Sequence, residues 1–444
     1  MSEAVSEAAR EAAGAPLRVG LAGLGTVGGG AARLLADNAA LIAARAGRPV
    51  VLTAVSARDR ARDRGVDLSA VAWEADPAAL AARPDVDVVV EAIGGAEGPG
   101  RDVVEAALAQ GRPVVTANKA LLAHHGAALA AQAERAGLAL RFEAAVAGGI
   151  PIVKALAEGL AANRATRVYG VLNGTCNYIL TQMARSGRDY PAVLAEAQAK
   201  GYAEADPAFD VGGVDAGHKL ALLATLAFGC APDFDGVSLE GIERVSLADI
   251  AHADELGYRV KLLGVARRAG DGVERAVRPC LVRADSAIGQ LDGVTNAVVV
   301  EADPIGQTVF EGPGAGAGPT ASAIVADLID IARGARGPAF GVPAATLTPP
   351  GPGAAPAAAP IAAHYLRLSL QDRPGALAEV AQDLGLEGVS IRAMRQHDKP
   401  ADGAATVLIV THACARAALD RALARITASP VSLADPVALR IEDV

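Results

Sequence analysis

Cysteine, aromatic side chains and long apolar runs are all scarce in this sequence of 444 residues. The four cysteines are widely separated and form no CxxC pair, so neither a zinc site nor a disulfide framework is expected, and a reducing cytoplasmic location fits. No apolar run reaches the roughly 20 residues needed to span a bilayer. Residues 1–15 are acidic and rich in alanine, which predicts a flexible tail and not a secretory signal.

The sequence also lacks a dense block of lysine and arginine, and its formal net charge is -9. A nucleic acid partner is therefore not expected, because the phosphate backbone is bound mainly by clustered positive charge. Aromatic residues make up only 3 % of the chain, whereas hydrophobic residues make up 52 %. Small aliphatic side chains must then fill the cores, and the length predicts two or three domains.

Residues 17–143 alternate between short apolar runs and helical segments rich in alanine and leucine. The runs expected as strands begin near Leu17, Val50, Asp87, Pro113 and Leu138. Apolar strands separated by helices are typical of a parallel sheet that is covered on both faces. The fold class expected for this region is therefore α/β, with a Rossmann-type doubly wound parallel sheet.

The pattern changes after this region. Residues 144–314 combine helices with several longer strands, which predicts a second α/β domain with a mixed sheet. Residues 339–363 are dominated by proline, alanine and glycine, a composition typical of an extended linker. Residues 364–444 follow the order strand, helix, strand, strand, helix, strand, which predicts a small ferredoxin-like module.

A glycine motif follows the first expected strand directly. It is Gly23-Leu24-Gly25-Thr26-Val27-Gly28, a GxGxxG sequence between a strand and a helix. The first glycine allows a tight turn, the second lets the backbone approach a pyrophosphate, and the third lets helix and strand pack closely. The helix N-terminus then presents free N–H groups to the phosphates. Dinucleotide binding is the expected function, with a purely structural turn as the alternative.

The end of the second strand bears on the choice of cofactor. An NAD-specific site usually places an acidic residue there, which binds the ribose 2′-hydroxyl. This chain has Arg58 followed by Asp59. The Arg58 guanidinium can bind the 2′-phosphate of NADP in a forked geometry, so NADP is favoured. Asp59 keeps NAD as an alternative, and Arg58 can also be an ordinary solvated loop charge.

Two further segments carry candidate catalytic groups. Lys119 follows the fourth expected strand, and ligands of open α/β sheets gather beyond the carboxyl ends of the strands. Asp215 and Lys219 lie four residues apart, on one face of an expected helix that continues with an apolar run. A lysine so placed can give a proton to a carbonyl oxygen while a hydride arrives, which typically contributes about 10²- to 10⁴-fold.

These groups have plainer interpretations as well. Lys119 can be a surface lysine at a helix start, and Asp215 with Lys219 can be an ordinary helical ion pair. Glu204, upstream of the helix, can hold an ammonium group. His218 lies on another side of the same helix and is given no catalytic role.

Together these segments resemble homoserine dehydrogenase over about residues 17–335. They are GLGTVG from Gly23, ANK ending at Lys119, FEAAVAGGIPI from Phe142, VLNGTCNYIL from Val171, GYAEADPAFDVGGVDAGHKL from Gly201 and GPGAGAGPTASA from Gly312. The order and spacing of the segments make the resemblance specific. It implies the reversible, NAD(P)H-dependent reduction of L-aspartate 4-semialdehyde to L-homoserine, a step in threonine, methionine and isoleucine biosynthesis.

The resemblance implies roles for the candidate catalytic groups. Lys219 would donate a proton to the aldehyde oxygen, and Asp215 would bind and orient the substrate. Glu204 would bind the substrate amino group, and Lys119 would lie between nicotinamide and substrate. Residues 144–314 would then be the substrate-binding, catalytic and dimerisation domain.

The resemblance also defines the cofactor domain. Residues 16–143, joined by about 315–338, would form the NAD(P)-binding domain. Thr26 and Val27 would lie in its phosphate loop beside the three motif glycines, and Gly316 would close over the cofactor.

A monovalent cation such as Na⁺ is a further implication of the resemblance. Its ligands would come from the Glu143 carboxylate region and from the carbonyl groups of Val146, Gly148 and Ile150. A run of turn carbonyls beside one carboxylate suits a hard cation. A loop without a bound ion is the alternative, and the cation would be structural and not catalytic.

The C-terminal module resembles an ACT domain. Its first strand is followed by Asp372-Arg373-Pro374-Gly375-Ala376-Leu377, a turn that opens the first helix. In that family such a turn helps to bind an amino acid between paired modules, so Asp372, Gly375 and Leu377 are the expected effector ligands. Threonine is the effector that the resemblance implies, in a homodimer or homotetramer. A module that only dimerises the protein is the alternative.

Two other functions remain as alternatives. A thiol-dependent semialdehyde dehydrogenase would need a cysteine nucleophile with a base, and Cys176 is the one tempting candidate. A sensor that binds NADP and an amino acid without catalysis would share the same domains. The joint presence of Lys219, Asp215, Glu204 and Lys119 favours the enzyme.

Overall fold

The computed structural model describes residues 14–203, 206–270, 272–349, 361–398 and 404–444. By contacts within the chain it divides into two compact units. Unit 1 comprises the described residues up to 168 with 215–235 and 295–349, and unit 2 comprises the rest. Among the described helices, none is both long enough and apolar enough to cross a membrane.

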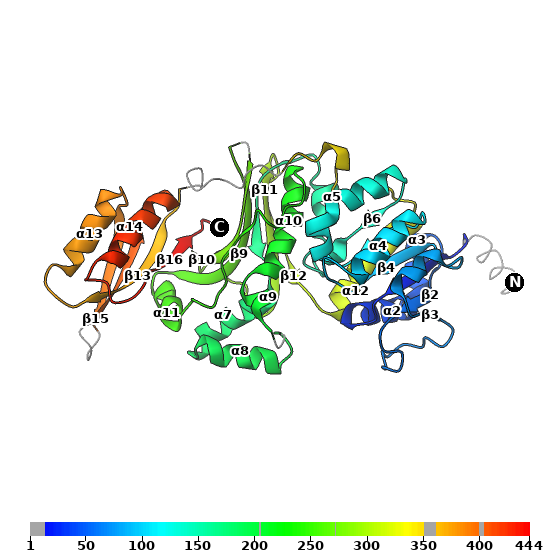
Figure 1. Ribbon diagram of the computed structural model, residues 1–444, viewed down its shortest axis with the longest axis horizontal. Coiled ribbons are helices and arrows are strands. Elements are labelled where there is room, and N and C mark those ends of the chain that lie inside the picture. The colour runs from blue at the N-terminus through cyan, green and yellow to red at the C-terminus, as the bar shows by residue number, and fades with distance from the viewer. Residues whose placement is uncertain (1–13, 204–205, 271, 350–360, 399–403) are drawn as a thin grey trace. The chain divides into compact units, whose positions relative to one another are not determined.

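Unit 1 is built on a sheet of six strands in the order β3-β2-β1-β4-β5-β6, in which all neighbours are parallel (Figure 1). The strands are β1 (Leu17–Ala22), β2 (Val50–Ser56), β3 (Ala72–Glu74), β4 (Val88–Glu91), β5 (Val114–Thr116) and β6 (Leu140–Arg141). This is the strand order of a dinucleotide-binding fold. The expected Rossmann-type sheet is confirmed, although the sequence pattern did not reveal the short strand β3.

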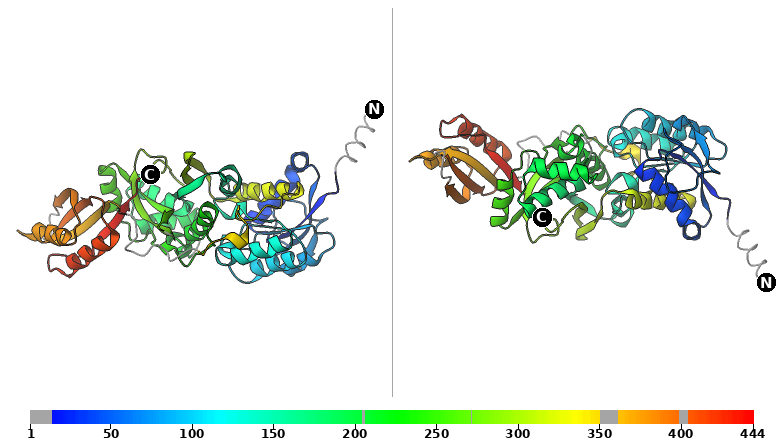
Figure 2. Two further views of the ribbon diagram at one scale, coloured as in Figure 1. Left: turned by 90° about the horizontal axis from the view of Figure 1, so that it is seen from above. Right: turned by 90° about the horizontal axis from the view of Figure 1, so that it is seen from below.

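Helices cover both faces of this sheet (Figure 2). They are α2 (Thr26–Asp37), α3 (Ala39–Ala46), α4 (Pro99–Ala109), α5 (Lys119–Arg135), α12 (Ala317–Ala332) and the 3₁₀ segment η1 (Pro77–Ala82). Helix α12 comes from far along the chain, yet Ala321 and Ile324 are buried in one core with Val19 of β1. A Cβ on Gly30 of α2 would lie 2.7 Å from the carbonyl oxygen of Ala317. Small residues are needed at this crossing because the two helix backbones touch.

The remaining elements of unit 1 are shorter or less regular. They are η2 (Glu143–Ala145), α6 (Ile152–Lys154), η3 (Ala155–Gly159), most of β7 (Arg164–Val171), α10 (Val214–Phe228) from its second residue, β11 (Thr295–Asp303), β12 (Gly306–Pro313) and η4 (Ala344–Thr346). Strands β11 and β12 form an antiparallel hairpin. The segment after Pro151 does not form one regular helix. Instead, α6 continues into the π-helical turn η3, where the N–H of Leu160 donates to the carbonyl of Ala155.

The first part of unit 2 combines a helical group with a long hairpin. The helices are α7 (Gly174–Ser186), α8 (Tyr190–Ala199), α9 (Ala208–Val211) and α11 (Leu247–Glu255), and the strands are β8 (Ser238–Leu239), β9 (Tyr258–Ala269) and β10 (Gly272–Arg283). Strands β9 and β10 are antiparallel, whereas β8 is parallel to β10. The expected mixed sheet is therefore confirmed.

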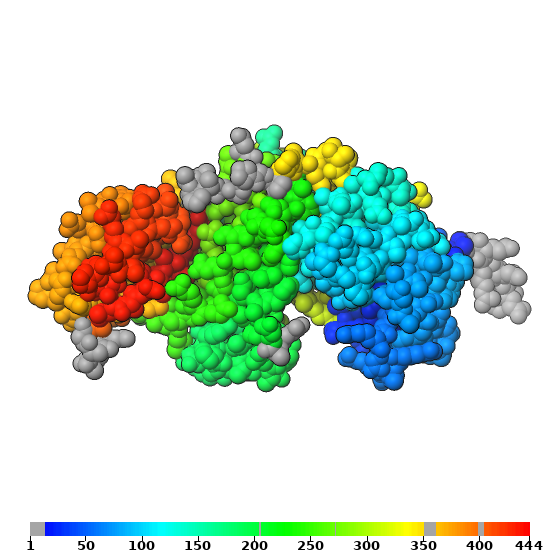
Figure 3. All heavy atoms as spheres, viewed as in Figure 1, coloured from blue at the N-terminus to red at the C-terminus, as the bar shows by residue number. Residues whose placement is uncertain are grey.

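The second part of unit 2 is the ferredoxin-like module. Its elements are β13 (His364–Gln371), α13 (Ala376–Leu386), β14 (Ile391–Asp398), β15 (Ala404–Thr411), α14 (Arg416–Ala428) and β16 (Val437–Ile441). The strands pair antiparallel in the order β16-β13-β15-β14, and α13 and α14 form the orange and red surface in Figure 3. Strand β16 also pairs with β10 in parallel, through Cys280 with Arg440 and Leu281 with Ile441. The module's sheet thus continues that of β9 and β10.

Candidate active site

The glycine motif folds as a tight turn between β1 and α2. Gly23 has a φ of +92°, and a Cβ there would lie 2.6 Å from the carbonyl oxygen of Ala92. A Cβ on Gly28 would lie 1.8 Å from the carbonyl oxygen of Gly23. A side chain at either position would therefore collide with the backbone, as the roles of the first and third glycines require.

The second glycine lies at an open place at the start of α2. Gly25 is exposed, and a Cβ there would have no neighbour within 4 Å. It is the N-cap of α2 and offers no side-chain acceptor, so the helix N-terminus begins with Thr26 and Val27. Helix α12 begins in the same way, at the N-cap Gly316 with a φ of +116°. An anion is favoured at an uncapped helix N-terminus, so these residues fit the pyrophosphate of a dinucleotide.

The end of β2 carries charges of both signs. Arg58 is exposed and lies in the loop that directly follows the strand. The carboxylate of Asp59 accepts the backbone N–H groups of Ala61 and Arg62, with O–N distances of 2.9 and 3.2 Å. Asp59 therefore caps a local turn, while the Arg58 side chain extends into solvent.

Two more arginines of this loop were not singled out from the sequence. The Nε atom of Arg64 donates to the carbonyl oxygen of Leu24, in the phosphate loop, at 3.2 Å. The guanidinium carbons of Arg60 and Arg64 lie 5.3 and 5.5 Å from the centre of the Trp73 ring. The loop after β2 is thus attached to the phosphate loop and carries a cluster of positive charge.

Glu91, the last residue of β4, organises two neighbouring loops and was not identified from the sequence. Its Oε1 atom accepts the N–H groups of Ile93 and Gly94 at 2.8 and 2.9 Å, and its Oε2 atom accepts the Thr116 hydroxyl. Burial of the side chain raises the pKa of Glu91. These contacts fix the loops after β4 and β5 at the carboxyl edge of the sheet. A signal existed, because an acidic residue that ends an all-valine strand needs polar partners.

Asn118 determines where α5 begins. Its Oδ1 atom accepts the N–H of Leu121 at 3.0 Å, which caps the helix, and its Nδ2 atom donates to the carbonyl of Gly95 at 2.7 Å. Lys119 is therefore the first residue of α5, at the carboxyl edge of the sheet. The sequence predicted that this lysine follows a strand at the carboxyl edge of the sheet, and the structure has it there.

One buried carboxylate bridges two lysines in unit 1. The Oδ1 atom of Asp215 lies 3.1 Å from Nζ of Lys119, and its Oδ2 atom accepts a hydrogen bond of 2.8 Å from Nζ of Lys219. The side chains of Asp215 and Lys219 are each 9 % exposed, and that of Lys119 is 28 % exposed. The three formal charges sum to +1, which favours a negative charge that develops nearby. The sequence pattern predicted the pair within α10, whereas the contact with Lys119 depends on the fold.

His218 packs in an aromatic group next to this cluster in the sequence. Its ring centre lies 4.1 Å from that of Phe234 and 5.5 Å from that of His124. Burial, with the nearby charges of His124 and Lys119, lowers the pKa of His218 to about 4. The imidazole is therefore neutral at pH 7, and packing is the role that the structure gives it.

Replacing His218 by phenylalanine should reduce the acid sensitivity of the protein. In the unfolded chain a histidine takes up its proton near pH 6.5, whereas His218 in the folded chain does so near pH 4. The unfolded state thus binds more protons in this window, and stability falls as the pH drops through it, by about 3 kcal/mol in all. Unfolding midpoints measured between pH 7 and 4.5 should fall less in the variant. Parallel curves for the two proteins would contradict this account.

The segments around Asn173 and Asp210 meet in unit 2. The Oδ1 atom of Asn173 accepts the N–H of Cys176 at 2.8 Å, which caps α7, and its Nδ2 atom donates to Oδ1 of Asp210 at 2.9 Å. The buried Cys176 thiol donates to the carbonyl of Asp210 at 3.3 Å. A buried thiol that is bound to a carbonyl does not suit a nucleophile. Glu204 lies outside the described residues.

Glu143, expected near a cation, binds the start of α6 in unit 1. Its two carboxylate oxygens accept the N–H groups of Val153 and Lys154, each at 2.9 Å, and its own N–H donates to Asp327 at 2.9 Å. Burial, together with the Asp327 charge, raises the pKa of Glu143 to about 7. The carboxylate therefore serves as a helix cap here.

The other expected cation ligands lie in the tight loop that follows. Val146 donates its N–H to the carbonyl of Glu143, and the Ile150 carbonyl accepts the N–H of Ile152 at 2.8 Å. A Cβ on Gly148 would lie 2.7 Å from the Thr320 hydroxyl, so a larger residue there would displace the Thr320 side chain. The loop therefore offers backbone carbonyl groups, the kind of donor that a hard cation prefers.

The expected effector turn of the module is accessible. Asp372 is exposed, Gly375 has a φ of +91° as the N-cap of α13, and Leu377 is half-buried against the module core. The Arg373 guanidinium binds Glu379 across this turn at 2.7 Å. The turn thus joins one exposed carboxylate to an uncapped helix start.

Comparison with known proteins supports the resemblance to homoserine dehydrogenase over most of the chain. Family models match homoserine dehydrogenase at residues 151–329, its NAD binding domain at 23–143 and an ACT domain at 364–430. A homoserine dehydrogenase of Neisseria gonorrhoeae is 46 % identical over 417 residues, which cover 93 % of this chain and 95 % of the relative. One of Pseudomonas aeruginosa is 44 % identical over 434 residues, 97 % of this chain and 99 % of the relative. The chain belongs to the homoserine dehydrogenase family.

The fold leads to the same family. The crystal structure of a homoserine dehydrogenase from Thiobacillus denitrificans has a TM-score of 0.90 at 42 % sequence identity, and covers 97 % of this chain and 99 % of the other. The chain is therefore an NAD(P)-dependent oxidoreductase that acts on a CH–OH group, with a C-terminal ACT domain. Together with the buried Cys176, membership of the homoserine dehydrogenase family removes the basis for a thiol-dependent aldehyde dehydrogenase.

Proposed function

We propose that this homoserine dehydrogenase homologue reversibly reduces L-aspartate 4-semialdehyde to L-homoserine, for threonine, methionine and isoleucine biosynthesis in the cytoplasm. The observation that carries the proposal is the buried Asp215 carboxylate, which holds Lys119 and Lys219 together. These residues lie in the two regions that match the family's NAD binding domain and its catalytic domain. Amine and carboxylate groups of this kind can bind an amino acid substrate and move a proton.

In the proposed mechanism Lys219 is the general acid. When bound, the reduced nicotinamide supplies a hydride to the aldehyde carbon, and negative charge then builds up on the aldehyde oxygen. The Lys219 ammonium group gives its proton to that oxygen, which yields the alcohol and a neutral amine, and solvent later restores the proton. Asp215 orients Lys219 through the 2.8 Å hydrogen bond, and the excess positive charge of the cluster stabilises the oxyanion. Glu204 is the proposed partner of the substrate ammonium group.

An absorbance assay at the NADPH band tests this function. Semialdehyde should cause oxidation of NADPH, and homoserine with NADP should cause the reverse. Binding of NADPH and threonine without any turnover would instead establish a sensor of the two ligands.

NADP is the proposed cofactor, with NAD as the weaker alternative. Arg58 is exposed at the end of β2, and Arg60 and Arg64 add positive charge to the same loop. The acidic neighbour Asp59 is engaged with backbone N–H groups of the loop. A doubly charged 2′-phosphate is favoured by such a set of charges.

Replacing Arg58 by alanine should raise the KM for NADPH by at least about 10-fold and leave the KM for NADH unchanged. The basis is the loss of one charge-assisted hydrogen bond to a phosphate, which is worth about 1.5–3 kcal/mol. Arg62, which is also exposed, provides the matched control, and Arg62→Ala should behave like the unaltered protein. Equal changes for both cofactors would contradict a role at the 2′-phosphate.

A monovalent cation such as Na⁺ is proposed at the loop of Val146, Gly148 and Ile150, as a structural element. Carbonyl oxygens, including that of Glu143, are the proposed ligands, since the Glu143 carboxylate caps α6. Activity and melting temperature should then both rise when Na⁺ replaces a bulky organic cation at constant ionic strength.

The ACT domain is proposed to bind threonine and to inhibit the enzyme. Asp372, Gly375 and Leu377 are the proposed ligands, in a homodimer or homotetramer whose ACT modules pair. Threonine added to the NADPH assay should suppress turnover by the unaltered chain. Turnover that no amino acid affects would favour a module that only dimerises the protein.

A further inference from the structure

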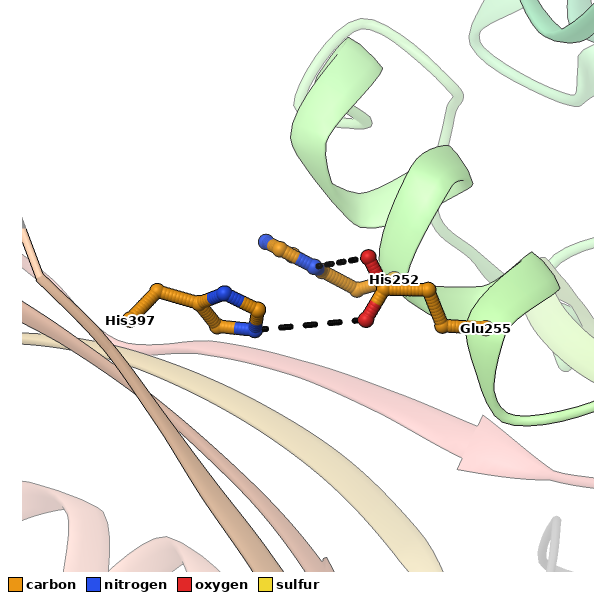
Figure 4. Close-up of side chains that lie close together, drawn as sticks. All are labelled: His252, Glu255 and His397. Carbon is orange, nitrogen blue, oxygen red and sulfur yellow. Dashed lines mark ion pairs between the residues drawn. The ribbon is translucent and has the colours of Figure 1, made fainter.

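Three side chains with metal-binding atoms meet in unit 2, and none of them belongs to the groups described so far. His252 and Glu255 lie one turn apart on α11, and His397 lies on β14 (Figure 4). Glu255 Oε1 is 3.9 Å from His252 Nδ1, and Glu255 Oε2 is 4.0 Å from His397 Nε2. One ligand atom from each residue can be chosen so that all three lie within 4.8 Å of one another.

The two imidazole nitrogens that face Glu255 are unsatisfied. Among the described residues, neither His252 Nδ1 nor His397 Nε2 has a hydrogen-bond partner, although both atoms are buried. Buried polar atoms nearly always have such a partner, or a water molecule or ion in its place. The centres of the two rings are 4.7 Å apart, and the ring planes are tilted by 33°. Both rings can bind one ion because their ligand atoms lie within 4.8 Å of each other.

The charges around the cluster allow a cation. Glu255 supplies one negative charge beside both rings, and an imidazole binds metals in its neutral form. The guanidinium of Arg395 opposes a cation, because its Nη1 atom lies 3.2 Å from Glu255 Oε2. The other carboxylate oxygen, Oε1, faces His252.

We propose that His252, Glu255 and His397 form a binding site for a divalent transition metal such as Zn²⁺. Two imidazoles and one carboxylate are a common set of three protein ligands for zinc, with water in the fourth position. Ligand bonds of about 2.0–2.2 Å require the three ligand atoms to lie somewhat closer together than in this structure, where they fall within 4.8 Å of one another. The side chains of Glu255 and His397 are 42 and 38 % exposed, so an ion can reach the site from solvent.

The site has a structural consequence within unit 2. Helix α11 precedes β9 in the first part of the unit, whereas β14 is an edge strand of the ACT module. A bound metal would therefore join the ACT module to α11, next to the existing contact of Arg395 with Glu255. Zinc should accordingly raise the melting temperature of the full chain.

Metal titration of the full chain tests the proposal. The protein is stripped with a chelator, dialysed and titrated with Zn²⁺ in a calorimeter, and with Co²⁺ while the visible spectrum is recorded. One ion per chain is expected, with cobalt absorption typical of imidazole ligands. His397→Ala should weaken zinc binding by at least about 100-fold, since loss of a mere supporting partner already costs 10- to 100-fold. Arg395→Ala should strengthen it, because an opposing charge is removed.

Control variants distinguish a specific metal site from nonspecific zinc binding. His412 is exposed in the same module, so His412→Ala should leave zinc affinity unchanged. His252 is the more buried ligand, and if His252→Ala fails to fold, Glu255→Gln takes its place with the same expected loss. NADPH oxidation by each variant confirms that the chain is folded. Zinc binding that survives His397→Ala, or that is absent from the unaltered chain, overturns the proposal.

Discussion

Replacing Lys219 by alanine is expected to lower kcat for semialdehyde reduction by at least about 100-fold, while the affinity for NADPH stays nearly unchanged. The lysine is 9 % exposed and bound to Asp215, so its ammonium group is held in one place and largely shielded from water. Steady-state rates measure the first quantity, and quenching of protein fluorescence by NADPH measures the second.

A second helical ion pair provides the control for this prediction. Lys200 is also four residues after its acidic partner, Glu196, but its side chain is 50 % exposed. Lys200→Ala should leave kcat unchanged, because exposed pairs of this spacing contribute only about 0.3–0.5 kcal/mol. If Lys219→Ala kept its turnover, or if both variants lost it equally, Lys219 would not be the general acid.

Replacing Gly28 by alanine is expected to lower the stability of unit 1 by at least about 3 kcal/mol, at the upper end of what overpacking costs. The new Cβ would lie 1.8 Å from the Gly23 carbonyl oxygen, and that oxygen belongs to the backbone of the phosphate loop. Helix α2 or the loop must then move, so NADPH binding should be lost as well. Thermal melting and NADPH titration measure the two effects.

The adjacent residue, Gly29, provides a matched control for this prediction. Gly29 is also buried in α2, but a Cβ there would be 3.9 Å from its nearest neighbour, the carbonyl oxygen of Leu24. Gly29→Ala should stabilise the helix by about 0.5–1 kcal/mol. The melting temperatures of the two variants should differ by on the order of 10 °C. Equal melting temperatures would show that close packing of α2 on the loop is not what requires Gly28.

Much of unit 1 could be predicted because its signals are local. The glycine motif alone predicts a tight turn. The run of valines in β4 likewise predicts a buried strand, whichever strands it pairs with. Asp215 and Lys219 share a helix face, so their contact follows from a spacing of four residues. The ACT module was recognisable for a similar reason, because each of its strands and helices has its own hydrophobic pattern.

The contacts that sequence analysis missed join residues far apart in the chain. Arg64 binds the carbonyl of Leu24, and Glu91 binds Thr116 on the next strand. Strand β12 has no clear sequence signal. None of its residues is buried, and the exposed Val309 is followed by the half-buried Phe310, so apolar and polar residues do not alternate along it. The meeting of Lys119 with Asp215 depends in the same way on how α5 and α10 pack, which no local spacing encodes.

The most direct test of the proposed reaction follows the hydride itself. NADPH that carries deuterium at the transferable position of C4 is incubated with the protein and L-aspartate 4-semialdehyde, and the product is analysed by mass spectrometry. The account predicts homoserine with one deuterium, bound to the carbon of the new alcohol group. Homoserine without deuterium, or no homoserine at all while both ligands bind, would contradict it.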